Sequence, residues 1–296
     1  MHIEYIPAKT IISGFKTNEK WFGNHYNMNI YKGCNHGCIY CDSRSDCYHI
    51  DNFDKIRVKD NAVSIIEEEL RKKRKTGIVA TGAMSDPYNY LEKDLKLTRQ
   101  ALELINKYHY GITIATKSDL IIRVRDILSK IKEHSPTLCK ITITTADDTL
   151  CKIIEPNVSL SSERFSAVKA LSEQGIFTGV LLMPVLPFIT DSPDNIKQIV
   201  RISAENGAKF IYCSIGMTLR SNQRIHYYEK LDKYFPRLKE RYILKYGDAY
   251  MCGVPEAKAL WQIFKTECKK YNLLYKMDDI IRAYQDEYKN EQLTLF

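Results

Sequence analysis

The sequence predicts an α/β fold in which parallel strands alternate with helices and curl into a barrel or partial barrel. Short β-branched runs alternate along the chain with longer stretches of helical periodicity. The strand-like runs are nearly continuously apolar, which is typical of strands covered on both faces, as in a parallel sheet. Right-handed β–α–β connections repeated six times bend such a sheet toward a barrel. The six runs are residues 28–33, 77–82, 111–116, 139–145, 176–183 and 209–215.

The stretches between these runs have the spacing of amphipathic helices. In the first of them Val63, Ile66 and Leu70 fall on one helical face and charged residues fall elsewhere. A helix after each strand is what a repeated β–α unit requires. The expected helices are about residues 61–75, 94–108, 119–134, 161–174 and 193–206.

Beyond about Gly216 the alternation ends, and helical patterns rich in Tyr, Lys and Glu follow. These patterns cover residues 222–245, 255–271 and 277–290. We therefore expect a helical extension packed on the barrel. The predicted parts are an N-terminal segment (1–25), the barrel (26–220), the extension (221–290) and a tail (291–296).

The composition is that of a globular chain without a membrane span. The 296 residues are 44% hydrophobic and 27% charged, enough to bury one large core. No apolar run approaches the roughly 18–20 residues that cross a bilayer, and the N-terminus lacks the pattern of a signal peptide. We expect a cytoplasmic protein. Its net charge of +8 is compatible with a nucleic-acid partner but does not establish one.

The strongest chemical signal is GCNHGCIYC at residues 33–41, directly after the first predicted strand. Cys34, Cys38 and Cys41 are spaced so that three thiolates can converge on one soft metal centre. A four-iron cluster with three protein ligands leaves one iron open to an exogenous ligand, which suits catalysis. A cluster that only carries electrons usually has four cysteine ligands.

Other uses of these cysteines remain open. A tetrahedral zinc site could take Cys47, His36 or His49 as a fourth ligand, and three buried cysteines could also be inert. The chain lacks a long extension rich in CxxC pairs, which argues against additional clusters. Cys252 and Cys268 nevertheless leave that question open.

The segment YKGCNHGCIYC resembles the cluster loop of the radical S-adenosylmethionine (SAM) superfamily, and particularly of its spore photoproduct lyase-like group. Further segments resemble successive blocks of that group, and together they cover about residues 25–220. These segments are TGAMSDPY (81–88), TRQALELI (98–105), ATKSDLIIRVRD (115–126), ITTADD (143–148), EPN (155–157) with Arg164, and MPVLPFITD (183–191).

The resemblance implies a partial (β/α)6 TIM-type barrel with a C-terminal helical extension. It also implies a [4Fe–4S] cluster on Cys34, Cys38 and Cys41, with SAM chelated to the open iron. One-electron reduction would split SAM into methionine and a 5′-deoxyadenosyl radical, which abstracts hydrogen from the substrate. A flavodoxin- or ferredoxin-type protein would supply the electron.

The same resemblance assigns SAM contacts to residues near the cluster and the second strand end. Tyr40 would meet the adenine, although an aromatic ring there could simply shield the cluster. Ser85 and Asp86 would contact the methionine amino group, whose N–H donors suit a hydroxyl and a carboxylate. The alternative is a plain turn, because Pro87 fixes the backbone of SDPY.

Three more SAM contacts are implied at the ends of later strands, where barrels place their ligands. Lys117 would meet the SAM carboxylate, Thr144 the ribose hydroxyls, and Met183 with Pro184 the adenine. The alternatives are a solvated lysine, an ordinary β-branched strand residue and core packing.

One position departs from the pattern of spore photoproduct lyases. Those enzymes carry a cysteine just ahead of the serine–aspartate pair, which returns a hydrogen atom to the product, and Ala83 stands there in this chain. Cys139 or Cys213 could replace that thiol if either faced the cavity. We therefore expect a related, DNA repair-like radical reaction on another nucleic-acid substrate. The alternatives are a radical SAM enzyme acting on a peptide or small molecule, and a non-catalytic metal-containing adaptor of the replication machinery.

The C-terminal sequence QLTLF resembles the short motif by which bacterial polymerases and repair proteins dock on the sliding clamp. An extended tail of this composition offers apolar anchors and a directed hydrogen bond to a pocket. The alternative is that it folds back on the helical extension. The residues concerned are Gln292, Leu293, Thr294, Leu295 and Phe296.

Overall fold

The computed structural model describes residues 3–15 and 21–289. Its centre is a seven-stranded sheet in the order β10-β9-β8-β7-β6-β3-β2, in which every neighbouring pair from β3 to β10 is parallel. The linear order leaves β10 and β2 at opposite edges, so the sheet forms a partial barrel. The strands are β2 (Ile12–Gly14), β3 (Tyr26–Met28), β6 (Ile78–Thr81), β7 (Gly111–Thr116), β8 (Thr137–Thr142), β9 (Phe177–Val185) and β10 (Phe210–Ile215).

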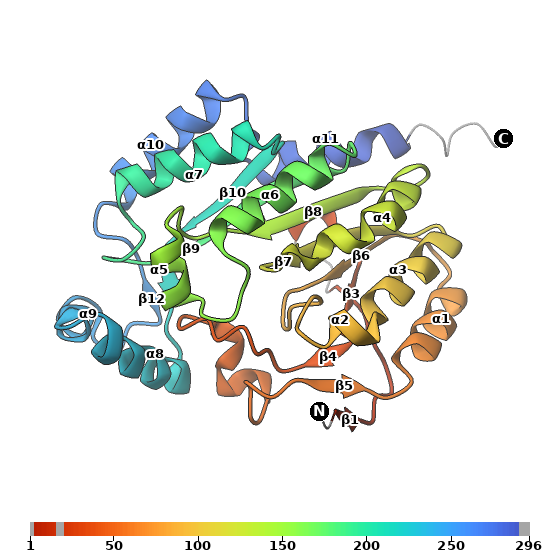
Figure 1. Ribbon diagram of the computed structural model, residues 1–296, viewed down its shortest axis with the longest axis horizontal. Coiled ribbons are helices and arrows are strands. Elements are labelled where there is room, and N and C mark those ends of the chain that lie inside the picture. Colours follow the sequence, from red (N-terminus) through yellow and green to blue (C-terminus); the bar gives the residue numbers. More distant parts are fainter. Residues whose placement is uncertain (1–2, 16–20, 290–296) are drawn as a thin grey trace.

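Helices follow the parallel strands and cover the outer face of the sheet, as predicted (Figure 1). Their apolar stripes pack on the outward side chains of the strands, such as Cys139 and Ile141 of β8. These helices are α1 (Ala62–Lys72), α2 (Glu92–Leu95), α3 (Leu97–Lys107), α4 (Arg125–Lys132) after the 3-10 helix η4 (Asp119–Val124), α5 (Asp148–Ile154), α6 (Ser161–Ser172) and α7 (Pro193–Glu205).

The first predicted strand, 28–33, is divided between two sheets. Residues up to Met28 belong to β3 in the main sheet, and β4 (Tyr31–Lys32) pairs antiparallel with β5 (Arg57–Lys59). β5 in turn pairs with β1 (Glu4–Ile6) in a small separate sheet. The apolar run is continuous because both sheets bury it, so the run alone could not show the break.

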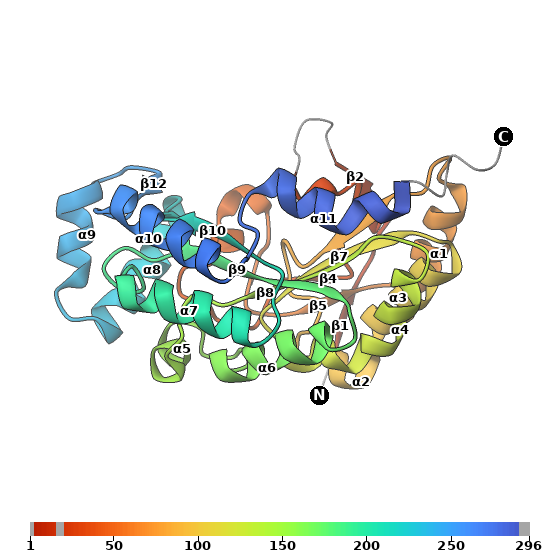
Figure 2. The ribbon, with the colours of Figure 1, turned by 90° about the horizontal axis from the view of Figure 1, so that it is seen from above.

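The amino end of the barrel is closed by two segments from opposite ends of the chain. One is η1 (Trp21–Gly23) and the other is α11 (Met277–Lys289). Figure 2 shows α11 on the opposite side of the sheet from α3, α4, α6 and α7. Tyr284 Oη donates a hydrogen bond to the carbonyl oxygen of Phe22. The apolar cluster at this end contains Phe22, Ile78, Leu138, Leu181, Phe210, Ile280 and Tyr284.

The predicted helix 222–245 is two helices, α8 (Ser221–Tyr234) and α9 (Leu238–Tyr246). The break falls at Pro236, which cannot donate a backbone hydrogen bond, and Arg237 adopts a φ of 65°. β11 (Met217–Thr218) pairs with β12 (Met251–Cys252), and α10 (Ala257–Lys270) follows. Among the described residues, no helix is both long and apolar enough to span a bilayer.

Candidate functional site

The cysteine loop begins at a position that only glycine can occupy. Gly33 has a φ of +85°, and a Cβ atom there would lie 2.4 Å from the carbonyl oxygen of Lys55. The chain therefore turns sharply after β4 and enters the loop. Cys38 and Cys41 are joined by a hydrogen bond from the amide of Cys41 to the carbonyl of Cys38, 3.2 Å long. Cys34 reaches the same loop after the turn, so one short segment carries all three thiols.

The loop is held from two sides by backbone and side-chain hydrogen bonds. The amide of Ile39 donates to the carbonyl of Ile154, at 3.0 Å, and Asn157 Nδ2 donates to the carbonyl of Asn35, at 2.8 Å. From the helical extension, the buried Gln223 Nε2 donates to the carbonyl of Tyr40, at 2.9 Å. The position of the cysteines thus depends on α5 and α8 as well as on the loop.

A buried charge network lies beneath the loop. Tyr40 Oη donates to Glu155, and Thr144 Oγ1 donates to the same carboxylate at 3.2 Å. Arg164 pairs with Glu155 and also donates to the carbonyl of Thr142, at 2.6 Å. Although burial opposes it, the positive charges of Arg164 and Lys117 hold the pKa of Glu155 below its ordinary value. Glu155 therefore stays ionised and anchors Tyr40.

The three thiols are a donor set that fits a [4Fe–4S] cluster with one open iron. Burial raises the pKa of Cys34 to about 11, and burial likewise raises the pKa values of Cys38 and Cys41. Binding to iron would thus release protons. A four-iron cube takes its thiolates on three different irons, so three cysteines of one short loop match it.

The side chains considered as a fourth zinc ligand face other groups. Cys47 is exposed and its Sγ lies 3.3 Å from Arg220 Nη1. His36 is buried, with Nδ1 3.5 Å from Asp86 Oδ2. These contacts do not bring either side chain into a three-ligand group with the cysteines.

A cavity of about 490 Å³ opens beside the cysteine loop, inside the barrel and at the carboxyl ends of its strands. Cys41 and Tyr40 line it from the loop, Lys117 follows β7, and Met183 lies on β9. The structure therefore brings four of the predicted SAM contacts, the fourth being Pro184, and one cluster cysteine to the same cavity. Lys117 Nζ lies 5.8 Å from the centre of the Tyr40 ring.

Ser85, Asp86 and Thr144, also predicted to contact SAM, bond to the protein itself and do not line this cavity. Ser85 Oγ donates to the carbonyl of Gly33, at 2.5 Å. Asp86 accepts hydrogen bonds from Thr116 Oγ1 and from the amide of Lys117, at 2.7 and 2.8 Å. These residues hold the loop after β6 against the cysteine loop and β7, and their contact with SAM stays a prediction.

The position that departs from the lyase pattern does face the cavity. Ala83 is among its lining residues, so a side chain there could reach a bound substrate. Cys139 and Cys213 instead belong to the apolar core between the sheet and the outer helices, and neither lines the cavity. Neither Cys139 nor Cys213 therefore supplies the thiol that is missing at position 83.

The deep end of the cavity holds polar residues that sequence reasoning missed. Lys140 on β8 and Asn24 are buried there, and the half-buried Asn27 of β3 lines the same cavity. Burial lowers the pKa of Lys140 to about 7. The sequence signal that could have found Lys140 is its place inside the strand-like run CKITITT. Lysine is seldom fully buried, so a lysine in a run expected to be buried indicates a special role.

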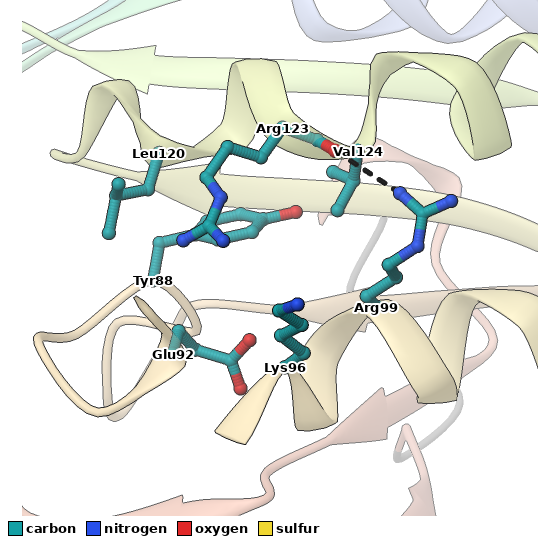
Figure 3. A pocket seen from close by; sticks show the side chains of 7 residues that line it. All are labelled: Tyr88, Glu92, Lys96, Arg99, Leu120, Arg123 and Val124. Atoms are coloured by element: carbon teal, nitrogen blue, oxygen red, sulfur yellow. Dashed lines mark hydrogen bonds between the residues drawn. The ribbon is translucent and has the colours of Figure 1, made fainter. Parts of the chain in front are cut away.

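A second pocket, of about 290 Å³, lies outside the barrel near α3 and η4 (Figure 3). Two of its polar residues, Arg99 and Glu92, are bound to neighbouring protein atoms. Arg99 donates to the carbonyl of Arg123, at 3.2 Å, and pairs with Asp126, at 2.6 Å. Glu92 accepts from Tyr31 Oη and the amide of Thr98. The pocket shares no lining residue with the barrel cavity, so the cysteine loop and the barrel cavity form the candidate site.

The cysteine loop and most of the barrel lie in a segment that matches a known family. The family model for the Radical SAM superfamily matches residues 28–201. An uncharacterized protein of Mycobacterium tuberculosis is 27% identical over 226 residues, which are 73% of this chain and 66% of that protein. An uncharacterized protein of Methanocaldococcus jannaschii is 34% identical over 173 residues, which are 57% of this chain and 63% of that protein. The chain thus spans slightly less than two thirds of these relatives.

Solved structures share the fold at low sequence identity. Spore photoproduct lyase complexed with dinucleoside spore photoproduct aligns with a TM-score of 0.67 and 14% identity, over 90% of this chain and 79% of the lyase. A variant of that lyase with bound AdoMet and the same dinucleoside aligns with a TM-score of 0.65 and 14% identity, over 86% and 77%. This chain and the lyase therefore share the partial barrel and its helical extension.

Proposed function

The chain belongs to the radical SAM superfamily, and we propose that it cleaves SAM reductively to a 5′-deoxyadenosyl radical that reacts with a nucleic acid. Enzymes of this superfamily bind a [4Fe–4S] cluster and SAM. When reduced, the cluster supplies the electron that splits the sulfonium bond. The residues of this chain would hold the cluster, orient SAM and exclude water.

One observation carries the proposal. The three thiols of a single loop lie at the carboxyl ends of the barrel strands, beside a cavity of about 490 Å³ that Cys41 itself lines. Cys34, Cys38 and Cys41 would hold the cluster, which would supply an open iron to a ligand. Because Cys41 and Tyr40 of the loop line the cavity, a ligand bound there would lie next to the loop that holds the cluster.

The remaining residues would orient SAM and exclude water. Lys117 offers a positive charge for the SAM carboxylate, and the Tyr40 ring offers an apolar face for adenine. Leu181 and Met183 line the same space without polar hydrogens. Such a wall excludes water from the part of the cavity that it lines.

A nucleic-acid substrate is supported by two features. The fold resembles that of a lyase solved with a dinucleoside, and the chain carries a net charge of +8, which favours polyanionic partners. Ala83 cannot return a hydrogen atom as a thiol does, so we propose a reaction other than repair of the spore photoproduct. A radical SAM enzyme with a peptide or small-molecule substrate is the alternative.

The test is anaerobic reconstitution with iron and sulfide, followed by dithionite and SAM, with 5′-deoxyadenosine measured by chromatography. We expect 5′-deoxyadenosine from the wild type and from Cys47→Ala, and none from Cys38→Ala. Single-stranded DNA, duplex DNA and RNA are then added separately, and one of them should raise the yield. A fully loaded protein that forms no 5′-deoxyadenosine would refute the activity. Stimulation by peptides alone would refute the nucleic-acid substrate.

Three partner and location assignments complete the proposal. A flavodoxin- or ferredoxin-type protein would donate the electron in the cytoplasm. The segment 292–296, which lies outside the described residues, would dock on a sliding clamp on the strength of its sequence alone. A pull-down on purified clamp, with full-length protein and with protein lacking these five residues, tests the docking. Equal retention of the two would end this part of the proposal.

A further inference from the structure

The deep end of the barrel cavity is polar although apolar residues surround it. Lys140 is 2% exposed and Asn24 is 8% exposed, and both line the cavity. Side chains alternate along β8, so Lys140 points into the barrel with Leu138, while Cys139 points to the outer helices. A lysine and an asparagine buried this far from the surface need polar partners.

The protein supplies only part of those partners. Lys140 Nζ donates to Thr113 Oγ1 at 3.2 Å, and Thr113 Oγ1 donates to Asn24 Oδ1 at 2.7 Å. These two hydrogen bonds fix the orientation of the Asn24 amide, and its Nδ2 group takes part in neither of them. Within the described residues, Asn24 Nδ2 and Asn27 Oδ1 are buried and have no hydrogen-bond partner. The residues that line the cavity therefore include an unused donor, an unused acceptor and the amino group of Lys140.

An aromatic ring lines the cavity near these groups. Trp21 is a lining residue, and it is held edge-on against Tyr212 of β10, with ring centroids 5.3 Å apart. Phe22 is completely buried behind the lining, with its ring centre 4.5 Å from Lys140 Nζ. A flat wall beside polar groups suits a planar heterocycle.

We infer that the deep end of this cavity is a recognition subsite for a nucleobase edge that carries a carbonyl oxygen next to an N–H group, as in uracil and thymine. Lys140 and Asn24 donate to the carbonyl oxygen, and Asn27 accepts from the N–H. The inference rests on the proposed nucleic-acid substrate. The adenine of SAM has no carbonyl oxygen, and its predicted contact Tyr40 lines the cavity from the cysteine loop.

Binding of defined oligonucleotides to the cluster-loaded protein tests the subsite. Fluorescence anisotropy would be measured anaerobically, with SAM present, on three labelled probes that differ at one base. The probes carry thymine, N3-methylthymine or adenine at one position of an otherwise all-adenine strand. We expect the wild type to bind the thymine probe about tenfold more tightly than the other two, the discrimination typical of a paired base edge.

The variants assign that preference to individual side chains. Lys140→Met and Asn27→Ala should each lose most of the preference for thymine, whereas Lys197→Met should keep it. Lys197 is exposed on α7, so its replacement removes the same charge away from the cavity. Thermal unfolding of each variant checks that it is folded.

Each outcome has a definite meaning. A wild type that binds all three probes equally would overturn the subsite and leave the nucleic-acid substrate standing. Equal loss of preference in Lys197→Met would show that net charge, and not the subsite, causes it. A wild type that binds none of the probes would instead overturn the proposed substrate itself. The comparison of thymine with N3-methylthymine needs no variant, so it stands even if Lys140→Met fails to fold.

Discussion

Arg164 and Glu155 form an ion pair, with 2.5 Å between Nη2 and Oε2, in which both side chains are completely buried. Tyr40, which lies between two of the cluster cysteines in sequence, donates its hydroxyl to the same carboxylate. The pair therefore connects α6 and the segment after α5 to the cysteine loop. A buried pair contributes little to net stability, but loss of one partner leaves an uncompensated charge.

Replacement of Arg164 by methionine should therefore destabilise the protein strongly. We expect a loss of about 3–5 kcal/mol in the free energy of unfolding, because Glu155 would remain buried without its partner. Urea unfolding of the cluster-loaded protein under anaerobic conditions measures it. Arg201→Met is the matched control, since Arg201 is 51% exposed and pairs with Glu205 on the surface. That control should change stability by less than about 0.5 kcal/mol, and equal losses would contradict the argument.

The pH dependence of the same pair has a defined sign. The pKa of Glu155 lies below its ordinary value of 4.5 in the folded protein, because Arg164 and Lys117 outweigh burial. Its ionic contribution is complete above pH 4.5 and is lost as the pH falls through the lower folded value. The difference between the wild type and Glu155→Gln, which cannot ionise at this position, should therefore be constant from pH 8 to pH 5 and shrink in more acidic solution. A difference that shrinks already above pH 6 would assign the effect to another group.

Lys117→Met should weaken SAM binding without removing the cluster. The loss of a charge-assisted contact to a carboxylate costs about 1.5–3 kcal/mol, which is at least about tenfold in the dissociation constant. Equilibrium dialysis of SAM against iron-loaded protein measures it. Lys209→Met, at an exposed position before β10, is the control. Unchanged SAM affinity in Lys117→Met would remove Lys117 from the site.

Gly82→Ala should disrupt the sheet at the mouth of the cavity. Gly82 has a φ of +95°, and a Cβ atom would lie 1.8 Å from the carbonyl oxygen of Ala115 on the neighbouring strand. Because backbone must move, we expect a loss of at least about 3 kcal/mol. Gly14→Ala is the control, since nothing lies within 4 Å of its Cβ position. Thermal unfolding of both variants measures the loss, and similar melting temperatures for Gly82→Ala and Gly14→Ala would show that the predicted clash does not occur.

Lys140 should make stability rise with pH in the alkaline range. Burial lowers its pKa from 10.5 to about 7, and among nearby titratable groups only Cys139 opposes this. Between pH 7 and pH 10.5 the unfolded chain binds a proton that the folded protein does not, so stability increases with pH there. Lys140→Met should therefore be more stable than the wild type by about 1–4 kcal/mol at pH 7. Urea unfolding at pH 7, 8 and 9 should show this advantage shrinking, and a constant advantage would contradict it.

The parallel sheet could be predicted because each strand is a short apolar run followed by a helical period. The cluster loop could be predicted because three cysteines are close in sequence, so local spacing already brings them together. The division of residues 28–33 between two sheets could not be predicted. Apolar residues are buried in the same way in either sheet, so the sequence does not show where one strand ends and the next begins. The polar network of Glu155 and Arg164 was visible only as a family resemblance, because their contact with Tyr40 spans 115 residues or more.

The deep end of the cavity illustrates a different limit. Lys140, Thr113 and Asn24 come from three separate segments, and only the register of β7 and β8 makes them neighbours. Periodicity shows which face of a strand is buried, but not which polar groups meet across a barrel. Ser85 and Asp86 show the opposite case. The sequence resemblance picked them out as SAM contacts, whereas the structure shows them bound to the backbone of Gly33 and Lys117.

The closure of the barrel by η1 and α11 has a consequence for synthesis. Phe22 and Tyr284 meet across 262 positions of the chain, so the apolar interior stays accessible to water until α11 has left the ribosome. Domains generally fold as units during translation, but this one can seal its interior only after α11 emerges. Stable assembly of the iron centre should accordingly follow translation, and chaperones would have the nascent barrel to protect until then.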